Sequence, residues 1–299
     1  MHKGYKREIP TDWKAYQIRD AISFTGGSQP PLSTFVFEAT EGYIRLLQTR
    51  AYRTDKSKTY IKAEDARKTC TSDDIIIGRY GPPLFQIFRG LEGAYNVALL
   101  KAIPDEKQIL KDYCFYYLSR PELQNYLEGL SQRSGGQTGV EMDMLYKYPL
   151  PLPPLPEQQK IAEILSTWDD AIKLTKEAIL ETKQRNKGLA QYLLTGKKRL
   201  DGFGGKWNEV KADNIFRNFT DKTHNGELEI LSATQENGVI PRSMNNIDIK
   251  YDSSSLNTYK KVEVGDFVIS LRSFQGGIEY SRYEGIVSPA YTVLKEVVP

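Results

Sequence analysis

The chain of 299 residues is 39% hydrophobic and 11% aromatic, which is enough for two domains with ordinary cores. Because the net charge is only +3, nucleic-acid binding would have to come from local clusters of basic residues. No apolar run is long enough to cross a membrane, and no apolar stretch follows the basic start MHKGYKREIP. Neither a membrane span nor a signal peptide is supported, and the cytoplasm is the expected location.

The first candidate site lies in the segment RLLQTRAYRTDKSK, which begins on a predicted strand and continues into the turn after it. Arginine and glutamine side chains read base edges in the major groove of DNA, whereas lysine contacts phosphate oxygens. A solvated basic loop is the alternative for this stretch taken alone. The candidate DNA-binding residues here are Arg45, Gln48, Arg50, Arg53, Lys56 and Lys58.

A short apolar run from Asp74 leads into a glycine-rich turn that carries Arg79 and Tyr80, the next candidates for DNA binding. Glycine permits a tight turn and a close approach of the backbone to a ligand, although a purely structural hairpin is the alternative. Two helices are expected over 106–118 and 122–130. The polar segment SQRSGGQTGV follows, and its Arg133 and Gln137 suit contact with a phosphate, while a flexible connector fits equally well.

The segment from Pro149 to Leu200 predicts an extended lead-in followed by one long amphipathic helix. Proline fixes φ and cannot continue a helix, so the helix is expected to open at Pro156 or Glu157. Apolar positions then recur at spacings of four and three, which is a heptad seam that requires a partner helix and predicts a buried Trp168 ring. The expected interface positions on this seam are Ile161, Leu165, Trp168, Ile172, Ile179 and Leu189.

Sequence before this helix partly recurs after it. WKAYQIRDAISFTGG from Trp13 matches WNEVKADNIFRNFTD from Trp207, DIIIGRYGPP from Asp74 matches DFVISLRSFQGG from Asp266, and AYNVALLK matches SPAYTVLK, at offsets of 192 to 194. A nearly constant offset predicts a duplicated domain. The corresponding candidates for DNA binding in the second copy are Gln235, Arg242, Arg272, Ser273 and Gln275.

The sequence contains no recognisable motif of a catalytic or cofactor site. The phosphate-loop, dinucleotide-turn and HExxH patterns are absent, and His2 and His224 are the only histidines. Cys70 and Cys114 are too few for a disulfide framework or a zinc cluster, and we expect both to be plain buried thiols. We therefore predict no metal site and no catalytic residue in this chain.

The central segment PLPPLPEQQKIAEILSTWDDAI continues to LLTGK, its lead-in is GGQTGVEMDMLYKYPLPLPP, and Trp13 and Trp207 open the two repeats. Together these stretches resemble the central conserved region and the domain boundaries of the specificity subunit of type I restriction and modification systems. The resemblance implies an α+β fold in which two similar target-recognition domains of twisted β-sheet and small helices are separated by a long helix. The first domain is expected at 1–150, the spacer helix at 151–200 and a second, incomplete domain at 201–299.

The resemblance implies that the chain does no chemistry itself. Each recognition domain would read one half of a split, asymmetric target in double-stranded DNA, while the helix sets the gap and docks methyltransferase subunits. Restriction and translocase subunits would join through the methyltransferase subunits. S-adenosylmethionine, ATP and Mg are expected on those partner subunits, and no cofactor on this chain. The family's second conserved helix is missing, so we expect a shortened form whose seam pairs with another copy or is covered by methyltransferase subunits.

Two other classes of function stay open. A coiled-coil scaffold that binds proteins, without sequence-specific DNA binding, is consistent with the seam. A nuclease or methyltransferase contained in one chain is disfavoured by the missing cofactor motifs. Sequence-selective retention of DNA with a steep salt dependence separates the specificity subunit from the scaffold.

Overall fold

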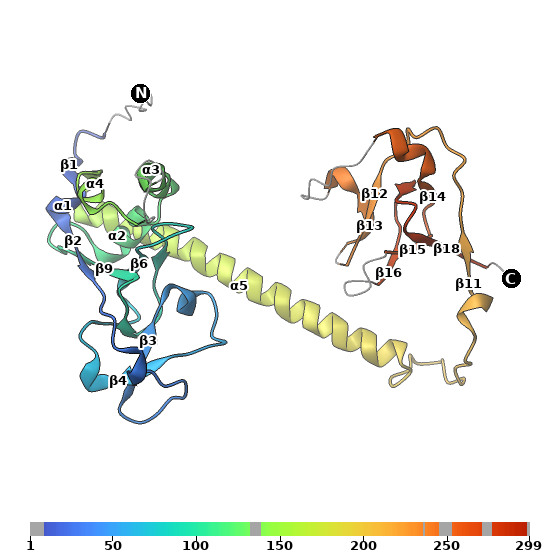
Figure 1. The fold of residues 1–299 in the computed structure, drawn as a ribbon, viewed down its shortest axis with the longest axis horizontal. Coiled ribbons are helices and arrows are strands. Elements are labelled where there is room, and N and C mark those ends of the chain that lie inside the picture. Colours follow the sequence, from blue (N-terminus) through green and yellow to red (C-terminus); the bar gives the residue numbers. More distant parts are fainter. Residues whose placement is uncertain (1–8, 132–138, 236, 245–252, 271–276, 298–299) are drawn as a thin grey trace. The chain divides into compact units, whose positions relative to one another are not determined.

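The computed structural model describes residues 9–131, 139–235, 237–244, 253–270 and 277–297 (Figure 1). It divides into two compact units, Met1–Lys187 and Gly188–Pro299. Within the described ranges, no helix combines the length and the apolar character that a membrane crossing requires.

The first unit is built on a four-stranded antiparallel sheet (Figure 1). In spatial order its strands are β2 (Ile22–Gly26), β9 (Leu99–Pro104), β6 (Ile75–Gly78) and β7 (Ile87–Phe88). Every residue of β6 is buried, as its continuous isoleucine run indicates, because a strand covered on both faces has no polar side to expose.

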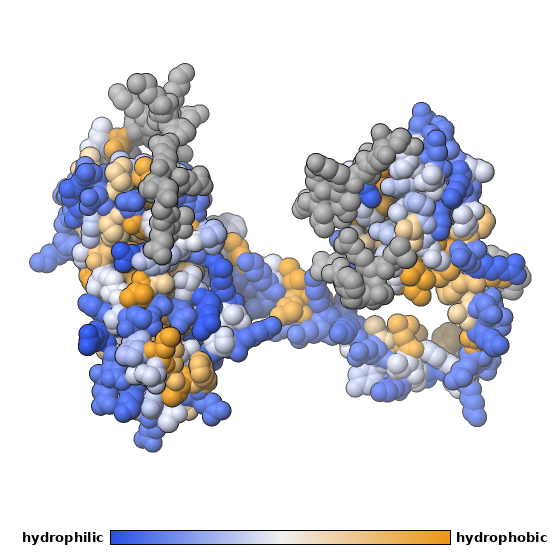
Figure 2. Space-filling view, in the orientation of Figure 1, coloured by the Kyte–Doolittle hydropathy of each residue, from blue (hydrophilic) through white to orange (hydrophobic). Residues whose placement is uncertain are grey.

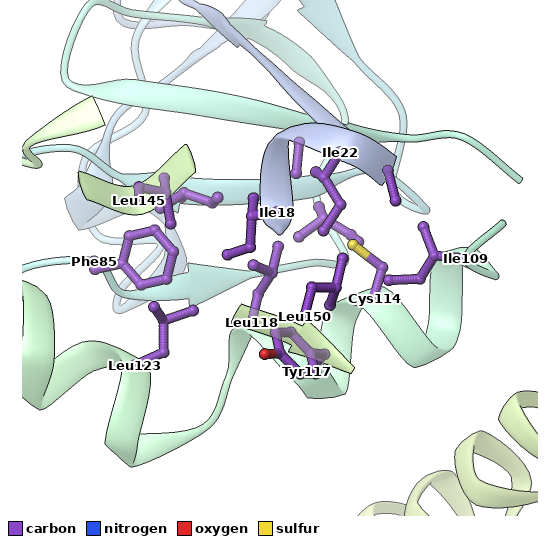
Figure 3. Packing of buried hydrophobic residues seen from close by; sticks show 14 of the residues in the cluster. Ile18, Ile22, Phe85, Ile109, Cys114, Tyr117, Leu118, Leu123, Leu145 and Leu150 are labelled. Atoms are coloured by element: carbon purple, nitrogen blue, oxygen red, sulfur yellow. The ribbon is translucent and has the colours of Figure 1, made fainter. Parts of the chain in front are cut away.

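The main core of this unit packs between that sheet and four short helices, which are α1 (Ile18–Ala21), α2 (Lys111–Leu118), α3 (Pro121–Ser131) and α4 (Met142–Tyr146). Figure 3 shows Ile18, Leu118, Leu123 and Leu145 turned toward one another, and none is more than 1% exposed. Each such side chain contributes about 1.5–3 kcal/mol by its burial. The helix predicted over 122–130 is confirmed as α3.

The helix predicted to begin at 106 in fact begins later, at Lys111 of α2. The backbone N–H groups of Gln108 and Ile109 both donate to the carbonyl of Asp105, which forms a turn. The N–H of Leu110 donates to the side chain of Gln158, far along the chain. A contact with a distant residue therefore delays the helix.

A second sheet of the first unit contains, in spatial order, β4 (Tyr60–Lys62), β3 (Tyr43–Leu47), β8 (Gly93–Tyr95) and β5 (Thr69–Cys70). The pair β3 and β8 is parallel, and the other pairs are antiparallel. Leu47 and Tyr95 of this sheet pack with Ile76 and Leu99 of the first sheet, so one apolar cluster joins the two sheets. The connecting 3-10 turns are η1 (Leu32–Thr34), η2 (Thr49–Tyr52) and η3 (Ala63–Asp65).

Both cysteines lie in the first unit as buried free thiols, which confirms that prediction. Burial raises the pKa of Cys70 to about 11 and that of Cys114 to about 12. Neither thiol ionises at neutral pH, so neither is a reactive nucleophile.

A two-stranded ribbon leads into the long helix. β1 (Lys14–Gln17) pairs antiparallel with β10 (Pro149–Leu152), and α5 follows as one helix of 40 residues, Leu155–Leu194. The predicted extended lead-in and long helix are thus confirmed. The helix begins one residue before Pro156, where the missing N–H of proline leaves no intrahelical hydrogen bond unmade.

The second unit has a four-stranded sheet of its own, with β11 (Phe216–Phe219), β18 (Thr292–Glu296), β15 (Phe267–Ile269) and β16 (Ile278–Tyr280) in spatial order. Two ribbons accompany it, β12 (Leu231–Thr234) with β13 (Gly238–Pro241) and β14 (Lys260–Val262) with β17 (Gly285–Val287). Its 3-10 turns are η4 (Ala212–Asn214), η5 (Arg242–Met244) and η6 (Ser253–Thr258). A cluster of valines with Leu231 forms the core, including Val239, Val262, Val268, Val287 and Val293.

The four-stranded sheets of the two units share one topology, as the predicted duplication requires. The orders β2-β9-β6-β7 and β11-β18-β15-β16 place corresponding strands in the same positions, all antiparallel. Asp74 and Asp266, matched in the sequence, are 8% and 5% exposed. Each accepts the backbone N–H of the residue three positions earlier, at 2.9 and 2.8 Å.

The lysine partners of these two aspartates differ in register. Lys101 lies 2.6 Å from the carboxylate of Asp74, and Lys295 lies 3.8 Å from that of Asp266. Ile76 and Val268 each lie two residues after the matched aspartate. Ile76 pairs with Lys101 and Val268 pairs with Val293, so Val293 is the structural counterpart of Lys101. The sequence match of Lys101 with Lys295 is therefore wrong by two strand positions. A shift of two residues keeps a side chain on the same face, which explains why both lysines still reach their aspartates.

Candidate nucleic-acid interface

Arg45, in the middle of β3, is held by acidic Asp55 in the loop that follows the strand. Its guanidinium lies 2.7 Å from the Asp55 carboxylate, and Lys58 lies 3.4 Å from the same group. The hydrogen bond from Arg45 lowers the pKa of Asp55, which therefore stays ionised at neutral pH. Arg45 and Lys58 thus brace this loop, while Arg50, Arg53 and Lys56 on it are exposed.

The structure brings this basic loop against the strand end that carries the second group of candidates. The Arg53 guanidinium donates to the side-chain oxygen of Gln86, whose amide nitrogen donates to the carbonyl of Pro83 at 2.8 Å. The rings of Tyr52 and Phe88 stack with their centroids 4.5 Å apart. Two segments chosen separately from the sequence therefore form one surface.

The turn after Arg79 and Tyr80 is fixed by its backbone and by α3. A Cβ on Gly81 would lie 2.6 Å from the backbone nitrogen of Leu84, so only glycine fits there. The N–H of Leu84 donates to Glu128, and its carbonyl accepts from Gln124, both at 3.1 Å. A turn held in this way presents its neighbouring side chains at low entropic cost on binding.

The third group of first-unit candidates, Arg133 and Gln137, lies outside the described residues. Its flanks are placed, however. Gly139 forms a β-bridge with Tyr80, and the N–H of Val140 donates to the carbonyl of Arg79 at 3.0 Å. The described chain therefore resumes, at Gly139, beside the turn at Arg79.

The candidates of the second unit are less well gathered. Gln235 lies in the turn between β12 and β13, and Arg242 follows β13 at its other end, so the structure does not bring them together. Arg272, Ser273 and Gln275 lie outside the described residues. Among the described residues, no group of three or more His, Cys, Asp or Glu side chains is arranged to hold a metal ion.

The root of α5 is anchored in the first unit by a buried glutamine that was not predicted as a functional residue. Gln158 is 0% exposed. Its amide oxygen accepts from Leu110 N–H, and its amide nitrogen donates to the carbonyls of Gln108 and Pro153, each at 2.9 Å. Nearby, the Trp13 indole donates to Glu157 at 3.2 Å. The repeat partner Trp207 lies beyond the other end of α5, beneath the guanidinium of Arg199.

The seam of α5 is unburied along most of its length. Ile161 is half-buried, but Leu165, Ile172, Ile179 and Leu189 are 38% to 52% exposed, and Trp168 is 66% exposed. Figure 2 shows apolar surface along this helix. The predicted burial of Trp168 is wrong for the single chain, because every residue from Glu163 to Lys187 is exposed. The seam pattern is present, and none of the described residues covers it along this stretch.

The family model of the type I restriction modification DNA specificity domain matches residues 10–184. The chain belongs to this family. The matched span contains the described surface around Arg79, the anchored root of α5 and its seam as far as Ile179. The match to the specificity-domain family thus covers the first unit and most of α5.

Curated relatives agree with this membership. The type I restriction enzyme MjaVIII specificity subunit of Methanocaldococcus jannaschii is 30% identical over 189 residues, which are 62% of this chain and 43% of the relative. The putative type I restriction enzyme MjaX specificity subunit of the same organism is 27% identical over 217 residues, 67% of this chain and 47% of the relative. The match thus spans under half the length of these specificity subunits.

A crystal structure of the type I restriction-modification system S subunit from M. genitalium has the same fold. It superposes with a TM-score of 0.57 at 14% identity and covers 99% of this chain and 75% of that chain. This likeness confirms the predicted α+β architecture of sheet units with a long helix.

Proposed function

We propose that the chain is a DNA-specificity subunit of a type I restriction-modification complex. Each of its two units reads one half of a split, asymmetric target in double-stranded DNA, and α5 sets the gap between the halves. The chain carries out no reaction itself. Methyltransferase subunits bind S-adenosylmethionine, and a restriction subunit that joins through them uses ATP and Mg.

The observation that carries this proposal is one sheet topology occurring twice, on either side of a single unbroken helix. Duplicated readers joined by a helix suit a target made of two halves. At 1.5 Å per residue the helix is about 60 Å long, which is the scale of a DNA contact that covers more than one helical turn. Membership of the specificity-domain family supports the same reading.

In the first unit, the contacts between the basic loop and the strand that leads to Arg79 support DNA contact through this surface. The exposed Arg50, Arg53 and Lys56 supply positive charge on the loop, and Tyr80, which is 41% exposed, lies beneath the Arg79 guanidinium. Arginine reads guanine edges in two-pronged contacts, and lysine neutralises phosphates. Arg45 and Lys58 act through the loop that they brace against Asp55.

We assign the exposed seam of α5 to protein partners. Its apolar positions follow the coiled-coil period, so a helix of another polypeptide fits the seam better than DNA does. Methyltransferase subunits or a second copy of this chain would cover it. The mass of the purified chain at micromolar concentration distinguishes the two, because self-pairing gives a dimer without any partner subunit.

The decisive experiment is methylome sequencing of a host that expresses the chain with its methyltransferase subunits. The proposal predicts one modified motif made of two defined halves with a fixed gap. Filter binding of the purified complex should then retain DNA of that motif selectively, with affinity falling steeply as salt rises. Absence of any new modified motif, together with retention that ignores sequence, would instead support the protein-binding scaffold.

A further inference from the structure

Hydrogen-bonded contacts attach α5 to the first unit at two separate points along the helix. The first is its root, where the buried Gln158 is bonded to three backbone groups and Glu157 accepts from the Trp13 indole. The second is a hydrogen bond of 2.9 Å from the hydroxyl of Tyr116 on α2 to the carboxylate of Asp169. One contact alone would leave the helix free to pivot, whereas two separated contacts fix a direction.

The space between α2 and the helix is a groove and not a packed interface. Its volume is about 410 Å³, and it is lined by Trp13, Tyr113, Tyr116, Ile161 and Leu165 among others. Close packing is what normally resists the tilting of a helix, because filled cores are hardly compressible. Because side chains do not fill this groove, tilting of α5 toward or away from α2 is resisted mainly by the Tyr116–Asp169 hydrogen bond. Among the described residues, it is the hydrogen bond to the rest of the first unit that lies farthest along α5 from Gln158.

The hydroxyl of Tyr116 is a hydrogen-bond donor at neutral pH. Burial, and then the hydrogen bond to the Asp169 carboxylate, raises the pKa of Tyr116 to about 12. The phenol therefore stays protonated and donates, while Asp169 supplies an acceptor. The ring of Tyr116 also packs edge-on against Phe115, at a centroid distance of 5.2 Å, so its removal would disturb more than the bond.

The rest of the helix amplifies any movement at this contact. Along the helix, Asp169 lies about 16 Å and Leu194 about 54 Å from Gln158, at 1.5 Å per residue. A sideways shift of about 1 Å at Asp169 with Gln158 as the pivot thus becomes about 3 Å at Leu194. One base pair rises about 3.4 Å along DNA. A shift of about 1 Å at the Tyr116–Asp169 contact therefore moves the far end of α5 by about the rise of one base pair.

We propose that Tyr116 is a positioning residue whose hydrogen bond to Asp169 fixes the direction of α5 and so restricts the target to one gap length. This inference rests on the proposed function, since it concerns the gap between the half-sites. Tyr116 touches neither DNA nor a partner in this scheme. Helix length sets the nominal gap, and the contact at Tyr116 determines how strictly that gap is enforced.

The test compares DNA targets that share both half-sites and differ only in the gap, which is one base pair shorter, correct or one base pair longer. The complex with methyltransferase subunits is measured as wild type, as Tyr116→Phe, which keeps the ring, and as Asp169→Ala. A target with the wrong gap forces the wild type to break the hydrogen bond. The ratio of the affinities for the correct and the wrong gap should therefore be roughly 2- to 10-fold smaller in both variants than in the wild type. Binding to the first half-site alone should not change.

Two further variants make the test specific. Asp169→Asn keeps an oxygen that accepts from the phenol, so it should retain more of the gap discrimination than Asp169→Ala. Tyr192→Phe removes the same hydroxyl from an exposed tyrosine of α5 and should match the wild type. If Tyr116→Phe discriminates gaps as well as the wild type does, the positioning role is refuted. A wild type without any split motif refutes the proposed function itself.

A second measurement needs no DNA. Because Cys70 and Cys114 are buried, spin labels can be placed on cysteines introduced at Lys107 in the first unit and at Lys187 on the helix. The distance between the labels should be narrowly distributed in the wild type and in Tyr192→Phe, and broader in Tyr116→Phe. Equal widths in all three proteins would overturn the inference whatever the DNA assay gives.

Discussion

Replacing Gln158 should detach the root of α5 from the first unit. Its side chain is 0% exposed and makes three hydrogen bonds of 2.9 Å, to the N–H of Leu110 and to the carbonyls of Gln108 and Pro153. No water can replace these bonds without opening the core. The substitution therefore tests whether one buried amide joins the helix to the recognition unit.

The expected loss follows from these contacts. Gln158→Met keeps the volume but leaves the N–H of Leu110 without its partner and removes two donors, which should lower the free energy of unfolding by about 2–4 kcal/mol. Gln158→Ala adds a cavity, which should bring the loss to about 3–5 kcal/mol. The neighbouring Gln159→Ala serves as the matched control, because Gln159 is exposed and should change stability by less than about 0.5 kcal/mol.

Hydrogen exchange measures this effect locally. Peptides that cover 105–118 and 150–165 should lose protection in both Gln158 variants, and peptides from the second unit should not. Urea unfolding of the same proteins gives the free energies. A Gln158→Met variant that loses less than about 1 kcal/mol and keeps the protection of the Leu110 amide would refute the reasoning.

Three other predictions concern the binding surface, the buried aspartates and the seam. Arg50→Ala and Arg79→Ala should each weaken binding to the first half-site by about 1–3 kcal/mol if they touch base edges, whereas equal losses on random DNA would assign them to phosphates. Burial alone would raise the pKa of Asp74, but the hydrogen bonds from Lys101 and the Thr71 N–H, together with the charges of Lys101 and Lys111, lower it, so the advantage of wild type over Asp74→Asn in thermal unfolding should shrink as pH falls below about 4. Burial raises the pKa of Asp266, so wild type should gain stability relative to Asp266→Asn on acidification. Trp168→Ala should change the stability of the isolated chain by less than about 0.5 kcal/mol and weaken binding of the partner that covers the seam.

Local patterns were sufficient to predict the main elements. The isoleucine run after Asp74 predicts the buried strand β6, and the prolines before Leu155 predict an extended lead-in to a long helix. The start of α2 was not predictable in this way, because it depends on Gln158, which lies 48 residues further along the chain than Leu110. The strand register in the four-stranded sheet of the second unit was not predictable either. Lys101 and Lys295 occupy strand positions that differ by two residues, yet each lies near a buried aspartate, so the sequence match does not reveal the shift.

The convergence of the candidate residues also depends on tertiary contacts. Nothing in the sequence links Arg53 with Gln86, or Tyr80 with Gly139, and those contacts define the surface. Gln158 did carry a usable signal. Counting back three residues from Ile161 continues the seam spacing to position 158, so a polar amide stands on the apolar face of the helix. A polar residue in phase with buried positions indicates a side chain whose hydrogen bonds are all made inside the protein.

The exposed seam of α5 shows that a heptad pattern does not identify the partner that covers a helix face. A heptad pattern indicates that one face of a helix is buried in some assembly, but any helix with a complementary face satisfies it, in the same chain or in another. From Glu163 to Lys187 every residue of the helix is exposed, so this stretch gains little burial from the first unit and depends mainly on helix propensity and local side-chain pairs. Such a stretch gains stability when a partner covers it. The direction of the helix should then be set twice, by Tyr116 at its root and by the partner along its seam, and the strictness of gap selection should rise on assembly.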